Sequence, residues 1–150
     1  MAAVTGASRE ALWAIVAGSR EGVLATIGAD GLPHLSNVYY VPDAGDGGTI
    51  RISTTATRAK GRNLLRDPRA VLHVRGADFF NFVVVEGEVD VALAGSPGDA
   101  AIDELYAVDS TFNGPSERPA FDHRMIGDRR MIVRLAVTNL YGLVHHGPRR

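Results

Sequence analysis

The sequence predicts a mainly β protein: a small antiparallel barrel with short flanking helices, in a single domain of residues 1–150. Six or seven stretches are rich in β-branched and aromatic residues and are separated by turn signals containing glycine, proline or aspartate. Only a few short segments have the apolar spacing of a helix. The 150 residues are enough to bury one core without disulfide or metal staples, and the chain has no cysteine for a disulfide or a thiolate metal site.

The first part of the chain is predicted to form one helix and one hairpin. Ser8 can cap a helix with a single apolar face, and Gly18 ends it. Residues 22–27 and 32–41 are runs of β-forming residues on either side of Asp30-Gly31, a dipeptide that favours a tight turn. We therefore expect two antiparallel strands joined by that turn.

A glycine-rich turn is expected to separate this hairpin from the next strand. Residues 42–48 read PDAGDGG, a composition typical of a turn. Residues 49–54 alternate as a half-buried strand would, so that Ile50 and Ile52 face the core. A short helix over residues 58–66 follows. It ends at an Asp-Pro dipeptide, because proline disfavours the helical conformation of the residue before it.

The second half of the chain is predicted to contain three strands and one helix. These are a strand at 70–74, a long strand at 79–93, a helix at 98–108 and a last strand at 130–140 that continues into 141–143. Gly87 lies in the middle of the long strand, where it indicates a bulge or a bend at a barrel corner. Residues 109–128 are expected to be a polar, proline-containing connection.

Charge and hydropathy exclude several classes of partner. The formal net charge is -1, which argues against a general nucleic-acid binder or a polybasic membrane protein. The N-terminal residues lack a signal-peptide pattern, and no apolar run approaches the roughly 20 residues that span a bilayer. We therefore expect a cytoplasmic protein that binds neither nucleic acid nor membrane.

The most informative segment is basic and lies where a strand gives way to a helix. Residues 51–75 contain seven of the 16 basic residues but a single acid, and Lys60 is the only lysine of the chain. Backbone N–H groups at a helix start, the cations Arg58 and Lys60, and the hydroxyls of Thr54, Thr55 and Thr57 could together bind phosphate oxygens. The alternative is a solvated helix whose arginine stems pack on the barrel, and the pattern alone does not separate the two.

Two further groups of residues could contact a flat ring. Ser36 and Asn37 lie on a predicted strand and could bond the edge of a heterocycle, although an ordinary strand has the same pattern. Phe80 and Phe82 share one face of another strand, where core packing is the alternative to ring stacking. Adjacent residues His145-His146 would point in opposite directions, so we expect no dedicated metal site.

Several of these segments together resemble a known family. They read GVLATIGADGLPHLSNVYY, RISTT, TRAKGRNLLRDPRAVL and VVEGEV. Their order, spacing and turns are similar to the split β-barrel flavin and deazaflavin superfamily that includes pyridoxamine 5′-phosphate oxidase. Within it, Arg58 to Arg69 resemble the R-A-K-x-R-N-L-x-R-D-P-R signature of the actinobacterial branch that uses the deazaflavin coenzyme F420. The resemblance implies an FMN-binding split-barrel fold.

The resemblance also implies a cofactor site shared by two subunits. The residues that it implies for the cofactor's phosphate are Thr54, Arg58, Lys60 and Asn63. The strand beside the tricyclic ring would contribute Ser36, Asn37 and Val38. The partner subunit would contribute Phe80 and Phe82 across a dimer interface. An obligate homodimer with the pocket at the subunit interface is therefore expected.

The activity that the resemblance implies is an F420-dependent oxidoreductase, which transfers hydride between the coenzyme and a conjugated organic substrate. Because the coenzyme carries out the chemistry, no catalytic dyad is needed, and the proton donor stays open between Tyr39, Tyr40 and solvent. An FMN-dependent oxidase or reductase, and a non-enzymatic carrier of F420, flavin or haem, are the alternatives. Oxidation of vitamin B6 is not expected, because the arginine-rich C-terminal substrate motif is absent.

Overall fold

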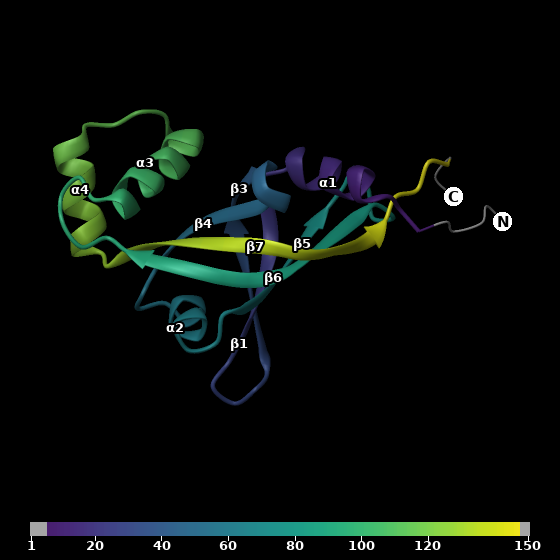
Figure 1. Ribbon diagram of the computed structural model, residues 1–150, viewed down its shortest axis with the longest axis horizontal. Coiled ribbons are helices and arrows are strands. Elements are labelled where there is room, and N and C mark those ends of the chain that lie inside the picture. The colour runs from purple at the N-terminus through teal and green to yellow at the C-terminus, as the bar shows by residue number, and fades with distance from the viewer. Residues whose placement is uncertain (1–5, 148–150) are drawn as a thin grey trace.

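The computed structural model describes residues 6–147, which fold around one antiparallel sheet that curls into a half-barrel (Figure 1). The strands are β1 (Glu21–Ile27), β2 (Pro33–Tyr39), β3 (Val41–Asp43), β4 (Thr49–Thr55), β5 (Arg69–Arg75), β6 (Phe82–Leu93) and β7 (Arg130–Leu143). The helices are α1 (Arg9–Ala17), α2 (Ala59–Arg66), α3 (Ala100–Asn113) and α4 (Arg118–Gly127), and η1 (Gly45–Gly47) is a single 3-10 turn. The mainly β split-barrel fold predicted from the sequence is confirmed.

The order of strands explains how the sheet closes on itself. It is β2-β1-β5-β6-β7-β4-β3, so the two edge strands, β2 and β3, are consecutive in the chain and separated by Tyr40 alone. Tyr40 is 0% exposed, and its hydroxyl donates to the carbonyl of Val16 in α1 at 2.7 Å. Burial raises the pKa of Tyr40 to about 12. This side chain therefore fixes both α1 and the point where the chain passes between the two edges.

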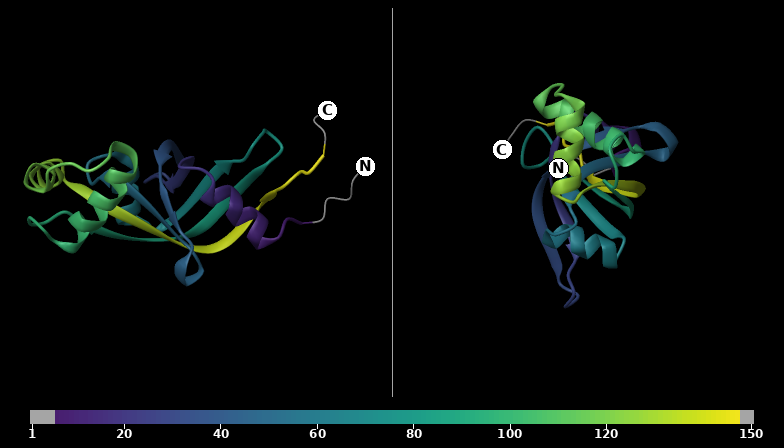
Figure 2. Two further views of the ribbon diagram at one scale, coloured as in Figure 1. Left: turned by 90° about the horizontal axis from the view of Figure 1, so that it is seen from above. Right: turned by 90° about the vertical axis from the view of Figure 1, so that its left-hand side faces the viewer.

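The longest strands, β6 and β7, run the length of the molecule (Figure 2), and α3 and α4 lie together at one end of them. Their register changes once, because Glu86 pairs with Asn139 whereas Gly87 pairs with Val137. Thr138 is thus the extra residue of a β-bulge. A Cβ atom on Gly87 would overlap the carbonyl oxygen of Ala136. The bend predicted at Gly87 is confirmed, and its cause is this close approach of two backbones.

The core has two parts. The larger part fills the half-barrel with alternate residues of the strands, including Ile50 and Ile52, which are buried as expected, and α1 covers it with Leu12 and Val16. The second part lies between α3, α4 and the sheet. None of the helices within residues 6–147 has the length and apolar character needed to cross a membrane.

Residues 109–128 were predicted to be an irregular connection, and this is wrong. Helix α3 continues to Asn113, and α4 occupies Arg118–Gly127. The segment is polar overall because each helix buries only one side, with Phe121 and Met125 of α4 packed against the second core. Pro119 is compatible with the helix because it lies in the first turn, where no intrahelical N–H bond is lost.

Ion pairs fix the two helices to the sheet and to each other. Arg118 of α4 pairs with Asp103 of α3 at 2.7 Å, which joins the helices. Asp122 is buried, and its carboxylate accepts hydrogen bonds from the Arg118 guanidinium at 3.1 Å and from the Gly98 N–H at 2.9 Å. Glu104 of α3 accepts from Arg134 of β7 at 2.7 Å. The α3–α4 pair is therefore held in a defined position above the sheet.

Two smaller differences concern turns. The expected turn at residues 42–48 begins later, because Val41–Asp43 pairs with β4; Pro42 is tolerated there since β3 is an edge strand. The strand expected from residue 79 begins at Phe82, because the N–H of Phe80 donates to the Asp78 carboxylate at 2.9 Å and holds a turn.

We predict that Gly87→Ala destabilises the protein by at least about 2 kcal/mol, since a methyl group there forces two strands apart. Gly127→Ala is the matched control, because Gly127 ends α4 and a methyl group added there would meet no atom within 4 Å. That variant should lose no stability. Urea unfolding of both variants measures the difference, and equal midpoints would contradict the close-approach account of the bulge.

Candidate functional site

A cavity of about 550 Å³ lies between the start of α2, the edge strand β2 and the α3–α4 pair. Ser53 near the end of β4 and Arg130 at the start of β7 also line the cavity. One side of the cavity is strongly basic, and another is apolar. These two sides come from different parts of the chain.

The basic side is formed by Arg58, Lys60 and Arg130. Burial, followed by the charges of Arg58 and Arg130, lowers the pKa of Lys60. Burial and the charge of Arg58 likewise lower the pKa of Arg130, whose Nε atom is buried without a hydrogen-bond partner in the described part of the chain. Within residues 6–147, none of the three forms an ion pair with an acid. The side chains therefore form a positive cluster without an ion-pair partner, which we call the cation cluster.

Local backbone contacts bring these three cations together. Gly61 of α2 lies against the carbonyl of Thr55, where any Cβ atom would overlap it, so the helix starts directly beside the end of β4. Thr55 pairs with Arg130 in the β4–β7 ladder, and its hydroxyl accepts the N–H of Arg58 at 3.2 Å. The start of α2 has no side-chain cap, so its first N–H groups add to the positive field.

The apolar side belongs to α3 and α4. Leu105, Val108 and Met125 are buried beneath it, and Phe112 in the last turn of α3 extends it. The ring of Phe112 lies 5.2 Å from that of Tyr39, centroid to centroid, at an interplanar angle of 43°. Asp109, Asn113, Arg124 and Asp128 complete this wall.

Strand β2 borders the cavity with Asn37, Val38 and Tyr39. It is an edge strand, so the backbone groups on its outer edge are not used by a neighbouring strand. Such groups can bond the edge of a flat ligand.

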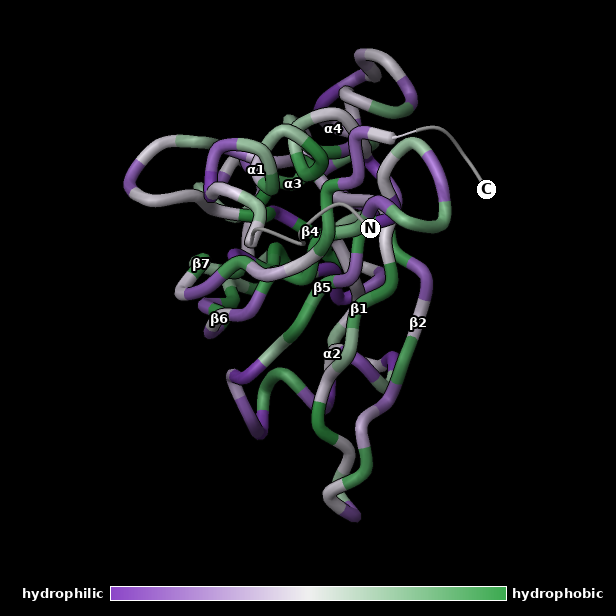
Figure 3. The backbone as a smooth tube through the Cα atoms, turned by 90° about the vertical axis from the view of Figure 1, so that its right-hand side faces the viewer, coloured by the Kyte–Doolittle hydropathy of each residue, from purple (hydrophilic) through white to green (hydrophobic). Residues whose placement is uncertain are grey.

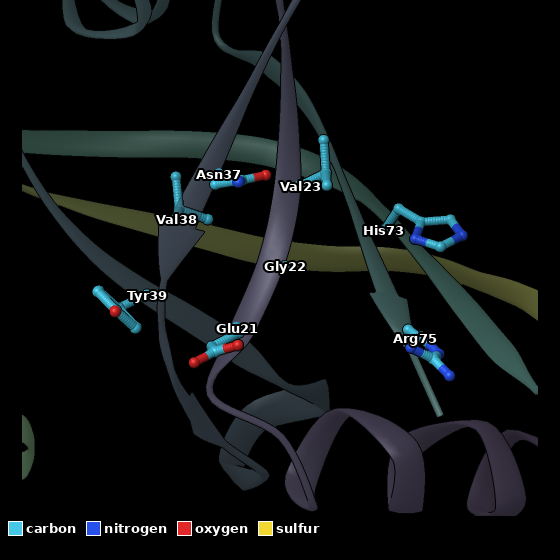
Figure 4. Close-up of a pocket in the computed structure, with 8 residues that line it drawn as sticks. All are labelled: Glu21, Gly22, Val23, Asn37, Val38, Tyr39, His73 and Arg75. Carbon is cyan, nitrogen blue, oxygen red and sulfur yellow. The ribbon is translucent and has the colours of Figure 1, made fainter. Parts of the chain in front are cut away.

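A second hollow of about 380 Å³ lies on the outward face of β2, β1 and β5 (Figure 4). It shares Asn37, Val38 and Tyr39 with the cavity. Figure 4 shows the side chains of His73 and Arg75 on the other side of β1. The end of β2 is thus the common wall of two hollows.

Four of the residues predicted to bind a cofactor meet in the cavity: Asn37, Val38, Arg58 and Lys60. Ser36 is half-buried and does not line it, and its hydroxyl has no partner among the described residues.

Two other predicted residues lie behind the cavity wall. Thr54 is 0% exposed, and its hydroxyl also has no partner among residues 6–147. Asn63 is buried, and its amide donates to Thr26 at 3.1 Å and accepts from Arg66 at 2.9 Å. The polar atoms of Asn63 therefore bond within the fold.

The two predicted aromatic residues lie away from the cavity. Phe80 is in the turn before β6. Phe82 begins that strand, and its ring stacks on His73 at 5.5 Å between centroids. Neither residue lines the cavity within this one chain.

We did not predict from the sequence that Arg130, Ser53 and the α3–α4 pair line the cavity. Ser53 and Arg130 are 77 positions apart, and only the β4–β7 pairing brings them to 3.4 Å. The sequence did contain a signal, because Arg129 directly precedes the last predicted strand and Arg130 begins it, which puts both at one end of the barrel.

A curled antiparallel sheet with a basic strand-to-helix turn at its mouth defines a split-barrel protein. The family model described as pyridoxamine 5′-phosphate oxidase matches residues 8–139. The chain therefore belongs to this family.

Solved structures support the same assignment. A conserved hypothetical protein from Mycobacterium tuberculosis is 26% identical, with a TM-score of 0.68 over 100% of this chain and 96% of its own. An F420 reductase is also 26% identical, with a TM-score of 0.58 over 80% of this chain and 87% of its own. A heme-binding protein from Mycobacterium smegmatis, 21% identical, has a TM-score of 0.61 over 89% of this chain and 53% of its own, a likeness of fold. The resemblance identified from the sequence motifs is confirmed.

The lowered pKa of Lys60 predicts a pH dependence of anion affinity. A bound phosphate favours the charged amine, so affinity falls as the pH rises through a pKa that lies below the ordinary 10.5. Calorimetric titration with FMN as a phosphate-bearing probe should show this decline. In Lys60→Arg the guanidinium stays charged, so the decline should vanish. The same decline in both proteins would contradict the role of Lys60.

Proposed function

We propose that the protein is an F420-dependent oxidoreductase, which transfers hydride between the deazaflavin coenzyme and a conjugated organic substrate. The observation that carries the proposal is the cation cluster of Arg58, Lys60 and Arg130, which has no ion-pair partner among the acids of residues 6–147. Membership of the pyridoxamine 5′-phosphate oxidase family and similarity to an F420 reductase support it.

The residues present fit a cofactor with a phosphate and a flat ring. The cation cluster and the first N–H groups of α2 would hold the phosphate. We propose Thr54 as part of the phosphate site because its buried hydroxyl has no partner among residues 6–147, whereas Asn63 would support α2 through its bonds to Thr26 and Arg66. Ser36, Asn37 and Val38 of β2 would border the ring.

When bound, the coenzyme would supply the hydride chemistry. The chain would bind the coenzyme, orient the substrate beside it and exclude water. A proton must also reach the substrate. The Tyr40 hydroxyl is buried and donates to Val16, so it is not placed to give one. Tyr39 lines the cavity and is 63% exposed, so we propose Tyr39 or solvent as the proton source.

An FMN-dependent oxidase or reductase is the second candidate, because the cation cluster would hold the phosphate of either cofactor. A non-enzymatic carrier of F420, flavin or haem would use the same cavity, since tight binding does not require turnover. The test is titration of the purified protein with F420, FMN and haem, followed by steady-state oxidation of reduced F420 with a panel of acceptors. Turnover would support the enzyme, and binding of F420 without turnover across the panel would support the carrier.

We also propose a homodimer in which a second copy covers the outward face of β2, β1, β5 and β6. This face contains the hollow at Asn37–Tyr39. Large apolar side chains are exposed around it, among them Leu35 and Tyr141, and β2 carries both hydrophobic and hydrophilic stretches (Figure 3). Phe80 and Phe82 would then reach the cavity of the partner copy rather than their own.

Arg58→Ala and Lys60→Ala are each predicted to weaken binding of F420 or FMN by about 1.5 to 3 kcal/mol, the scale of a charge-assisted hydrogen bond. Arg69→Ala is the matched control, because Arg69 is in the same basic segment but pairs with Asp67 at 2.7 Å outside the cavity. Calorimetry measures the cofactor affinity of the three variants. Unchanged affinity in both cavity variants would remove the proposed phosphate site.

Phe80→Ala is predicted to lower cofactor affinity only where the dimer forms. Sedimentation velocity gives the oligomeric state, and cofactor titration above and below the dissociation range gives the affinity. A monomer that binds the cofactor with full affinity would contradict a pocket shared by two subunits.

A further inference from the structure

We propose that Tyr39 and Phe112 form an aromatic clamp that selects the substrate, and that this substrate is a flat, conjugated and uncharged molecule. The inference rests on the proposed function, because it assigns the cavity's basic side to the cofactor. It assigns the opposite side, formed by α3 and α4, to the hydride acceptor.

The two rings form a packed pair at the edge of the cavity. Their centroids are 5.2 Å apart at a tilt of 43°, which is the separation of two aromatic rings in contact. A planar ligand would therefore stack against the outer side of the pair or separate the two rings. Tyr39 comes from the edge strand and Phe112 from the last turn of α3, so the pair joins the β2 side of the cavity to the α3 side. A Tyr39 side chain that is 63% exposed gains apolar contact when a flat molecule enters beside it.

The surroundings of Phe112 favour an apolar ligand. Leu105, Val108 and Met125 are 1%, 5% and 6% exposed and form a continuous apolar surface at this wall. A conjugated ring placed here would replace water on that surface and on the Phe112 ring.

The charges on this wall disfavour an anionic substrate. Asp109 and Asp128 line it together with Arg124, so acids outnumber cations on this wall by two to one. The two acids oppose the lowering of the pKa of Arg130 by burial, by Arg58 and by Arg124. A phosphate or carboxylate would be attracted to the cation cluster and repelled from these two acids. An uncharged ring avoids this repulsion, which is why the clamp fits a neutral acceptor.

The clamp also has a place to open. Phe112 is followed by Asn113 and then by Gly114, which ends α3 with a φ of 73°. Phe112 therefore lies at the terminus of its helix rather than in the middle, and the segment after it joins α4 without regular structure. Phe112 packs against the second core and against Tyr39, but the end of a helix opens more readily than its middle, so separation of the two rings would occur here.

The test compares Phe112→Leu, which keeps an apolar side chain but removes the ring, with Thr111→Ala, an exposed neighbour on the same helix that does not line the cavity. Calorimetry measures the binding of menadione, an uncharged flat naphthoquinone, and separately that of F420 and FMN. Phe112→Leu should bind menadione about three- to tenfold more weakly, the range expected for one aromatic contact, with cofactor affinity unchanged. Thr111→Ala should match the wild type in both measurements.

A charged probe tests the proposed substrate class. The wild type should bind a naphthoquinone sulfonate more weakly than menadione, and Asp109→Asn should narrow that difference. Equal affinity for both quinones in the wild type would overturn the preference for an uncharged acceptor.

The remaining outcomes separate this inference from the proposed function. Unchanged menadione binding in Phe112→Leu, with F420 still bound, would overturn the clamp and leave the oxidoreductase proposal standing. Equal losses of cofactor affinity and quinone affinity in Phe112→Leu would place the coenzyme ring, not the substrate, against Tyr39 and Phe112. That result would also overturn the clamp. A wild type that binds neither F420 nor FMN would refute the proposed function, while its menadione binding still reports on the clamp.

Discussion

Three positive charges held together without an ion-pair partner are the constraint on which this site depends. Arg58, Lys60 and Arg130 repel one another, and this repulsion together with burial lowers the pKa of Lys60 and of Arg130. A fold maintains such an arrangement only where the surrounding structure fixes it, and such groups gather at functional sites more often than elsewhere. The missing counter-charge is most simply supplied by an anionic ligand, which would relieve the repulsion on binding.

The fixed positions come from backbone contacts that have little to do with charge. The contact of Gly61 with Thr55 sets the start of α2 against β4, and the β4–β7 ladder brings Arg130 beside it. The bulge at Gly87 bends the two longest strands. The same strands support α3 and α4 at one end, where these helices form the apolar wall opposite the cations. One curled sheet thus positions both sides of the cavity.

Much of the fold could be predicted because its signals are local. The cap at Ser8, the alternation of Ile50 and Ile52 and the bulge glycine each depend on a few neighbouring residues. The basic turn was found for the same reason. Arg130 and the α3–α4 wall could not be placed, because they depend on strand pairing over a long sequence separation and on helices whose exposed sides make the segment look like a polar connection.

The most direct test of the account is a crystal structure of the protein with F420 bound. We predict that the coenzyme's phosphate lies within hydrogen-bond distance of Lys60 and of at least one of Arg58 and Arg130, with the ring beside the end of β2. A coenzyme bound elsewhere, with Lys60 directed into solvent, would contradict the central claim.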